Sequence, residues 1–393
     1  MSAPEPLKGI KVIEFTHMVM GPTVGHILAG LGAEVVRVEP IGGDQTRRLL
    51  GSGAGYFPMY NRGKQSICLD LKSAEGLAVA KDLIAATDVL VENFRPGALD
   101  RLGLNYDSCA ATNPRIIYCS EKGFLPGPYE RRTALDEVAQ MMGGLSYMTG
   151  PPGRPLRAGA SVIDVTGGMF GVIGVLAALE ERHRTGCGQK VVASLYETTA
   201  YLVGQHMAQF AVTGKPAAPM PARVSAWAIY DVFQTKDEPI FIGVVTDALW
   251  EKFCVLFQLE DLWVDESIRA NNQRVLARER ILPRISELIG GMTRDEVIAK
   301  LDGTGMPFAP IGRPEDLFED PHLNAGGLED VTLDNGTATK LPVIPIEMDG
   351  KRPALPRQLP APGQDTRAVL RALGYDPQRV SSLFASGAAG ESE

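Results

Sequence analysis

The 393-residue chain is long enough for two domains or for one large domain with an insertion. It is 45% hydrophobic and 22% charged, which is ordinary for a soluble globular protein, and its net charge of −8 argues against nucleic acid or an anionic membrane as a partner. The five cysteines show no paired spacing, so we expect reduced thiols rather than disulfides or a zinc site. Without a signal-peptide pattern or a run of 18 apolar residues, we expect a cytoplasmic protein that does not cross a membrane.

The first half of the chain alternates between strand-like and helix-like segments. Strands are predicted at residues 9–15, 33–39, 66–71, 88–92, 115–120 and 190–193, and helices at 23–31, 74–86, 98–102, 136–142 and 196–212. This alternation predicts an α/β fold with a parallel sheet that binds ligands at the carboxyl ends of its strands. Gly51, Gly53 and Gly55 follow no strand and open no helix, so they predict a mobile loop rather than a phosphate-binding turn.

A glycine-rich helical pattern occupies the middle of the chain, between Arg154 and Lys190. Its apolar residues recur at spacings of three and four, which predicts a helix buried on one face. Gly168, Gly171 and Gly174 leave another face bare, so we expect a second backbone to approach there. Asp164 falls at or just before the helix N-terminus, where N–H groups and the helix dipole stabilise a carboxylate. Spacing alone favours a simple N-cap over a catalytic carboxylate at this position.

The second half of the chain opens with a proline-rich connector at residues 214–222, a candidate domain boundary. A hairpin is predicted from 229–233 and 239–245, followed by helices at 249–257, 274–289 and 294–301 and a short strand at 307–311. From about Gly326 the chain is rich in proline and glycine. We expect a helix at 366–373 and disorder in the last residues, 385–393.

Two familiar kinds of catalytic site have no support in the sequence. No histidine falls between His26 and His183 and no GxSxG elbow occurs, so serine or cysteine hydrolysis is not expected. No His/Cys cluster predicts a metal site. Basic residues recur at predicted strand ends and loops; each alone is expected to be solvated surface charge, but together they would form a phosphate-binding rim. They are Arg37, Arg47, Arg48, Lys72, Arg95 and Arg101.

A set of segments along nearly the whole chain resembles one protein family. These are PLKGIKVIEFTHMVMGP, GAEVVRVEP, NRGKQSICLDLKSAEG, VENFRPGALDRLGL, NPRIIYCS, DEVAQMMGG and GASVIDVTGGMFGVIGVLAAL. In this order and spacing they resemble the family III CoA-transferases, a superfamily that includes formyl-CoA transferase, carnitine CoA-transferase and the α-methylacyl-CoA racemases.

The resemblance implies a site and a substrate. Asp164 falls on the family's nucleophilic aspartate, and Asp136 on an acidic residue that supports it. The positions that match the family's CoA contacts are His17, Met18, Arg37, Leu69, Asp70, Leu71, Lys72, Asn93, Phe94, Arg95 and Arg101. Coenzyme A and its acyl thioesters are then substrates, small carboxylic acids are the exchange partners, and no metal is needed.

The resemblance also implies an architecture. A large Rossmann-like parallel-sheet domain would be formed from both chain ends, residues 1–222 and 324–393, and a smaller α+β domain, residues 223–323, would be inserted between them. Two such chains would thread through each other as an interlocked homodimer.

Departures from the family pattern narrow the expected activity. Val19 replaces a glutamine of formyl-CoA transferase, whose mobile glycine run is also missing, which argues against formyl transfer. The racemases use a histidine before the aspartate, and this chain has none there. RPLRAGASVIDVTGG and RVSAWAIYDVF resemble the branch that handles C4–C5 diacids or a sulfinate analogue, with succinyl-CoA as the donor. A guanidinium would hold the unreacting carboxylate; the candidates are Arg47, Arg48, Arg157 and Arg223.

The expected function is therefore CoA transfer through an aspartyl-CoA thioester on Asp164. Two alternatives stay open, an acyl-CoA racemase or epimerase of the same fold and a non-catalytic CoA-binding protein.

Overall fold

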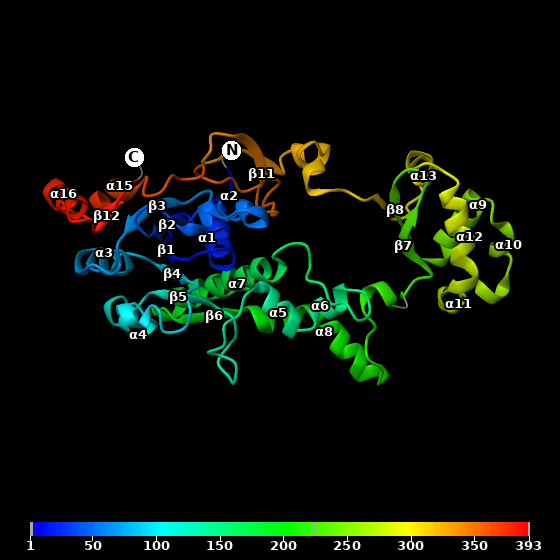
Figure 1. Cartoon of the computed structure of the whole chain (residues 1–393), viewed down its shortest axis with the longest axis horizontal. Helices are drawn as coiled ribbons and strands as arrows, with labels where there is room; N and C mark the ends of the chain where they lie inside the picture. Colours follow the sequence, from blue (N-terminus) through cyan, green and yellow to red (C-terminus); the bar gives the residue numbers. More distant parts are fainter. Residues whose placement is uncertain (1–2, 224, 392–393) are drawn as a thin grey trace. The chain divides into compact units, whose positions relative to one another are not determined.

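The computed structural model describes residues 3–223 and 225–391 (Figure 1). Its contacts divide the chain into two compact units. The first runs up to Pro221 and resumes at Pro321, and the second spans Ala222–Asp320. We propose that they are two domains, a large one built from both parts of the chain and a smaller one inserted near residues 223–323.

A seven-stranded sheet forms the centre of the first unit. Its strands are β1 (Lys11–Phe15), β2 (Glu34–Glu39), β3 (Gln65–Leu69), β4 (Val89–Glu92), β5 (Ile117–Lys122), β6 (Lys190–Ser194) and β12 (Ala389–Gly390). They lie in the order β12-β3-β2-β1-β4-β5-β6, all parallel except β12, which runs antiparallel to β3. The six parallel strands have the order of a doubly wound nucleotide-binding sheet, so the strand order reverses between β1 and β4. The predicted α/β fold with a parallel sheet is confirmed.

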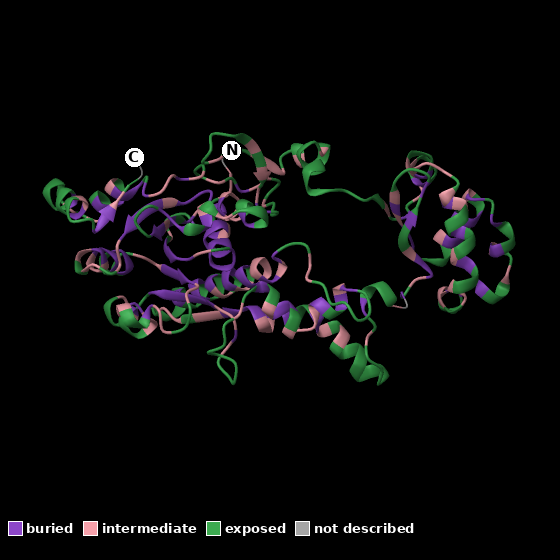
Figure 2. Ribbon diagram, in the orientation of Figure 1, coloured by how far each residue is buried: buried purple, intermediate pink, exposed green. Residues whose placement is uncertain are grey.

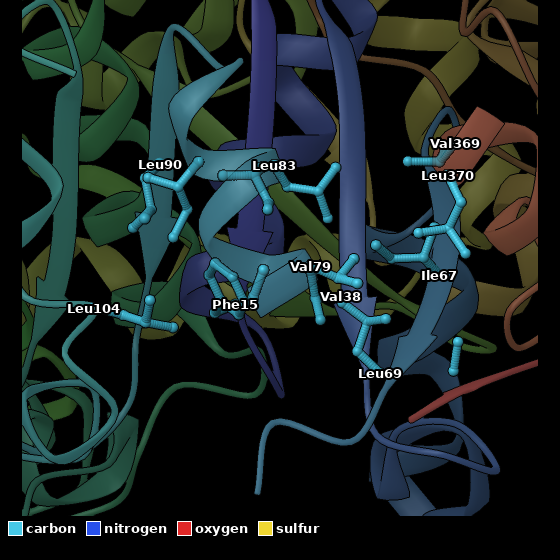
Figure 3. Close-up of a cluster of buried hydrophobic side chains, with 14 of the residues drawn as sticks. Phe15, Val38, Ile67, Leu69, Val79, Leu83, Leu90, Leu104, Val369 and Leu370 are labelled. Carbon is cyan, nitrogen blue, oxygen red and sulfur yellow. The ribbon is translucent and has the colours of Figure 1, made fainter. Parts of the chain in front are cut away.

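Helices cover both faces of this sheet. The helices of the first unit are α1 (Met20–Gly30), α2 (Tyr56–Tyr60), α3 (Ala74–Ala85), α4 (Tyr106–Thr112), α5 (Asp136–Met142), α6 (Leu145–Thr149), α7 (Val162–Thr185), α8 (Leu195–Thr213), α14 (Pro321–Asn324), α15 (Thr366–Ala372) and α16 (Pro377–Ala385). Because successive strand residues point to opposite faces, Ile13 and Leu90 join one core with α3 and α15, whereas Val12 and Val89 join a second core with α1 and α7. Figure 3 shows the first core and Figure 2 the burial of the strands.

The bare face of α7 packs closely against other elements, with backbone at Gly168 as predicted and with side chains at Gly171 and Gly174. A Cβ on Gly168 would lie 2.7 Å from the carbonyl oxygen of Met20 in α1, and one on Gly174 would lie 2.5 Å from Val191 Cγ1 in β6. At Gly171 it would overlap the carboxyl group of Glu121 on β5. Among the described residues α7 is the one helix long and apolar enough to span a membrane; a core helix of a soluble protein meets the same criteria.

The second unit has its own sheet and core. Three antiparallel strands, β7 (Ile229–Gln234), β8 (Pro239–Val244) and β9 (Phe308–Pro310), pack against helices. The helices are α9 (Asp247–Leu256), α10 (Glu260–Trp263), α11 (Asn271–Leu276), α12 (Arg278–Gly290) and α13 (Arg294–Leu301). Trp250, Phe253 and Ile285 lie at the centre of its core. The predicted hairpin is confirmed, but the single helix predicted at 274–289 is two helices that meet at Ala277.

Two loop predictions are corrected by the structure, and the tail contains a hairpin that the sequence did not predict. The glycines at 51–55 form a 3₁₀ turn that leads into α2. The Pro/Gly-rich tail contains a hairpin, β10 (Leu328–Thr332) and β11 (Ala338–Pro342). The segment 385–391 is ordered rather than disordered, because Ala389 pairs with Leu69 and is buried. This pairing covers one edge of the large sheet.

Candidate active site

Asp164 lies in the first turn of α7, inside the helix. The N-cap position belongs to Ser161, whose side chain makes no capping hydrogen bond. The cap comes instead from Asp136 on α5: its Oδ2 accepts hydrogen bonds from the backbone N–H of Ile163 (2.9 Å) and of Asp164 (3.1 Å). The N-cap interpretation of Asp164 is therefore wrong. The carboxyl group of Asp164 remains available because another residue does the capping.

The other carboxyl oxygen of Asp136, Oδ1, also has polar partners. Oδ1 accepts a hydrogen bond of 2.5 Å from Gln140 Nε2, one helical turn along α5. Arg157 places its guanidinium 3.5 Å from the same oxygen and 3.0 Å from Glu137. Gln140 Oε1 in turn accepts from the backbone N–H of Ala158, so α5 and the segment before α7 are tied together. Sequence reasoning missed Gln140, although its i+4 spacing from Asp136 could have indicated it.

The environment of Asp164 disfavours its charged form. Burial and, after it, the charge on Asp136 raise its pKa from 3.8 to about 7, against the opposing effect of Arg157. Tyr60 of α2 shares this region, since its own pKa is raised first by burial and then by the charge on Asp164. A poorly solvated carboxylate that no cation neutralises is typical of a reacting group rather than of a structural one.

The loops after β1 and β4 meet where the strand order reverses. The backbone N–H of His17 donates to Asn93 Oδ1, and Asn93 Nδ2 donates to the carbonyl oxygen of His17, both at 2.9 Å. The rings of His17 and Phe94 lie 5.4 Å apart. Met18 has φ of 61° and donates its N–H to Thr46 Oγ1 (3.2 Å). The structure thus brings together four predicted CoA-contact residues, with Asn93 fixing the loop geometry.

Two cavities flank this meeting point. The first, which we call the β1–β3 cavity, measures about 790 Å³ and is lined by His17, Met18 and the predicted segment Leu69, Asp70, Leu71 and Lys72. The second, the β4–β5 cavity, measures about 650 Å³ and is lined by Asn93, Phe94 and Arg95. His17 and Phe94 line both, and Leu135 in the second cavity directly precedes Asp136. Gly387 of the ordered tail also lines the first cavity.

The predicted arginines separate into free and committed groups. Arg37 is completely buried and donates to Glu14 (3.1 Å), Thr16 (2.9 Å) and Asp44 (2.5 Å), so it supports the cavity wall but lines neither cavity. Direct contact of Arg37 with CoA stays a prediction, and its burial behind the wall favours a supporting role. Its desolvation is offset by these three acceptors.

Arg47 is committed in the same way. It donates to both carboxyl oxygens of Glu39 (2.9 and 2.7 Å), to Asp334 (3.1 Å) and to the carbonyl oxygen of Pro360 (2.9 Å). Its guanidinium also lies 3.7 Å from the ring centroid of Phe57. Every donor edge is used, so the structure does not support Arg47 as a carboxylate clamp.

The remaining predicted arginines differ in position. Arg48 donates to the carbonyl oxygen of Gly42 (3.0 Å), and Arg101 is exposed in a 3₁₀ turn and lines neither cavity. Arg223 belongs to the second unit. Arg157, the remaining clamp candidate of the first unit, forms an ion pair with Asp136. Within residues 3–223 and 225–391 no group of three or more His, Cys, Asp or Glu side chains could hold a metal ion.

The sequence matches the family model described as CoA-transferase family III over residues 7–366. This chain belongs to CoA-transferase family III. It is 31% identical to the succinyl-CoA:glutarate CoA-transferase of Mus musculus, over 98% of this chain and 90% of that protein. It is 34% identical to the formyl-CoA:oxalate CoA-transferase of Rhodopseudomonas palustris, over 97% of each. A CaiB/BaiF family protein from Brucella suis superposes with a TM-score of 0.84 at 32% identity, covering 95% of this chain and 100% of that one. The protein is a family III CoA-transferase, and acyl-CoA is its substrate.

Proposed function

We propose that this CoA-transferase moves CoA from succinyl-CoA to a C4–C5 dicarboxylate or a sulfinate analogue, through an aspartyl-CoA thioester on Asp164. The observation that carries the proposal is the position of Asp164: a half-buried carboxyl with its pKa raised to about 7, in a helix whose N-terminus is capped by another residue. The relatives' names support the acid class, since glutarate and oxalate are both dicarboxylates.

The exchange divides into balanced steps. A carboxylate oxygen of Asp164 attacks the acyl carbonyl carbon of the donor. The C–S bond breaks, CoA leaves as a thiolate, and a mixed anhydride between Asp164 and the donor acid is formed. The thiolate attacks Cγ of Asp164 and releases the donor acid. The acceptor carboxylate then attacks that aspartyl thioester, and the freed thiolate attacks the acceptor carbonyl and restores Asp164. One thioester replaces another, so no external energy source is required, and covalent catalysis splits a difficult transfer into easier ones.

The residues around Asp164 have separable roles. Asp136 keeps the first turn of α7 in place and, by its charge, keeps the carboxylate of Asp164 reactive. The positive charge of Arg157 partly offsets the effect of the Asp136 charge on the pKa of Asp164. The N–H groups of Ile163 and Asp164 are already bound to Asp136, so they are not free to stabilise an oxyanion.

The two cavities suit a long substrate. We place the nucleotide half of CoA in the β1–β3 cavity, where Lys72 can meet a phosphate and Leu69 and Leu71 offer apolar surface. The pantetheine arm would pass His17 and Phe94 into the β4–β5 cavity, toward Leu135 and the neighbouring Asp136. This arrangement follows the rule that doubly wound sheets bind ligands where the strand order reverses.

We also propose an interlocked homodimer that acts in the cytoplasm. Large apolar side chains on α7 and α8 are exposed in the single chain, including Ile173 (58%), Tyr201 (73%) and Val212 (86%). Figure 2 shows the end of α8 exposed. Large exposed apolar side chains on two helices in contact with each other are typical of a protein–protein interface.

The decisive experiment is a substrate panel with succinyl-CoA as donor. Glutarate and other C4–C5 diacids should become thioesters much faster than butyrate, because the second carboxylate is recognised. Incubation with succinyl-CoA alone should add the mass of a CoA thioester to the peptide that contains Asp164. Equal rates for butyrate and glutarate would contradict the substrate class, and a CoA adduct on another peptide would contradict the nucleophile. Tight CoA binding without any transfer would favour the non-catalytic alternative.

A further inference from the structure

The β4–β5 cavity contains an arginine that the steps above do not use. Arg132 lies in the loop between β5 and α5, and its guanidinium is 5.0 Å from the ring centroid of Tyr129. Tyr129 packs edge-on against Phe124 (5.7 Å) and Tyr196 (6.2 Å), and Phe124 is only 2% exposed. The loop is therefore anchored to the core by aromatic contacts, and a cation–π contact restricts the guanidinium.

The guanidinium donors of Arg132 have no acceptor among residues 3–223 and 225–391. In the part of the chain that the structure describes, no hydrogen bond or ion pair involves the guanidinium groups of Arg132, Arg131 or Arg95, and all three residues line this cavity. Arg37 and Arg47, behind the other cavity, have their donors satisfied by carboxylates. All three arginines are exposed, so their guanidinium groups meet solvent, and a fork that no carboxylate occupies is available to bind anionic oxygens bidentately.

A buried acid in the same cavity wall has one carboxyl oxygen without a partner among the described residues. Glu121 lines the cavity at the end of β5, is 2% exposed, and its Oε2 has no hydrogen-bond partner among the described residues. Burial raises its pKa to about 8, so at neutral pH the group is mostly a neutral acid. It therefore adds a potential O–H donor rather than a negative charge. Two further acids, Asp100 and Glu130, line the cavity, and its Lys122 forms an ion pair with Glu92 behind the wall.

We propose that Arg132, assisted by Arg131 and Arg95, binds an anionic oxygen group of the substrates in the β4–β5 cavity. The group is either the free carboxylate of the dicarboxylate or the diphosphate of CoA, where the nucleotide half joins the pantetheine arm beside His17 and Phe94. This inference rests on the proposed function. It assigns the guanidinium clamp to Arg132 instead of Arg47. Leu135 joins this cavity to Asp136, so a group bound there is close to the reacting end of the site.

The test compares Arg132→Leu with a matched control, Arg379→Leu. Arg379 also stacks on a tyrosine, 5.9 Å from the ring centroid of Tyr375, but it lines neither cavity. Succinyl-CoA is the donor, glutarate and butyrate are the acceptors, and CoA binding is measured directly by calorimetry. Loss of a charge-assisted bidentate contact should weaken binding of its ligand roughly 10- to 100-fold. Arg132→Lys, which keeps the charge but not the fork, should recover part of the loss.

The pattern of losses identifies the anion. If Arg132 binds a phosphate, the Kd of CoA and the KM of succinyl-CoA rise with either acceptor. If it binds the carboxylate, the KM of glutarate rises while that of butyrate and the Kd of CoA do not. A folded Arg132→Leu protein with all of these values unchanged overturns the proposal, and Arg131→Leu provides the same test should the first variant not fold. Failure of the proposed function is seen separately, as a wild-type protein that transfers CoA to neither acid.

Discussion

Two buried clusters of charge in the first unit differ in how their carboxylates are neutralised. The first cluster contains Glu14 and Glu39 with their cations. Glu39 contacts Arg47 at 2.7 Å, and Glu14 contacts both Arg37 and Lys64. The pKa of Glu39 is lowered to about 2, since the hydrogen bonds and charges of its partners outweigh the opposing effect of burial. At the head of α7, Asp164 faces another carboxylate and its pKa is raised to about 7. Paired charges here stabilise the fold, whereas an unpaired carboxyl is available for chemistry.

The largest effect expected from this difference comes from removing the unpaired carboxyl of Asp164. Asp164→Ala should lower kcat by about 10³-fold or more, because no other group can form the acyl-enzyme bond. Its fold should be retained, since Asp164 donates only its backbone N–H to Asp136. The measurement is the rate of succinyl-CoA turnover, with calorimetry to confirm that CoA still binds. Activity within tenfold of wild type would exclude Asp164 as the nucleophile.

Removing a paired charge should have the opposite outcome, a large cost in stability. Arg37→Met leaves Asp44 without its cation and Glu14 with Lys64 alone, and breaking a buried pair costs about 3–5 kcal/mol. Urea denaturation of the variant should show an earlier transition. Arg184→Met, at an exposed position with no ion pair among the described residues, is the control and should change stability by less than about 0.5 kcal/mol. An Arg37 variant as stable as this control would contradict the structural role.

The smallest expected effect is a shift in the pH dependence. The reaction needs Asp164 ionised, so activity should rise with pH through about 7. Asp136→Asn removes the neighbouring charge while keeping an acceptor for the α7 N–H groups, so the pKa of Asp164 and the midpoint of the profile should both fall. Steady-state rates from pH 5 to 9 measure the midpoint; an unchanged profile would show that Asp136 does not act through charge.

The same pKa shift has a consequence for stability. Because the pKa of Asp164 is higher in the folded protein than its usual 3.8, the folded state binds more protons between about pH 4 and pH 7. The contribution of Asp164 to stability therefore falls as pH rises through that window. Asp164→Asn should raise the unfolding temperature relative to wild type at pH 8 and have little effect at pH 4.

The sequence by itself determined the parallel sheet and the helices that cover it, because strand and helix periodicities are local properties of the chain. It also placed Asp164 at the head of a glycine-faced helix, and the close contacts of Gly168 and Gly174 follow from their missing side chains. Periodicity could not indicate β12, since two residues form a strand only when β3 is there to pair with them.

What each charged residue does was decided by tertiary structure alone. Arg47 and Arg132 are both arginines near polar loops, but Arg47 meets Asp334 from nearly 300 positions away and is fully paired, whereas Arg132 meets a tyrosine ring and keeps its donors free. Asp136 and Asp164 are likewise two acids in helical segments. The fold brings the first onto the N–H groups of the second, so one becomes the cap and the other the unpaired carboxyl. Charge and pKa depend on which groups lie within a few ångströms, and that proximity is set by the packing of distant segments rather than by local sequence.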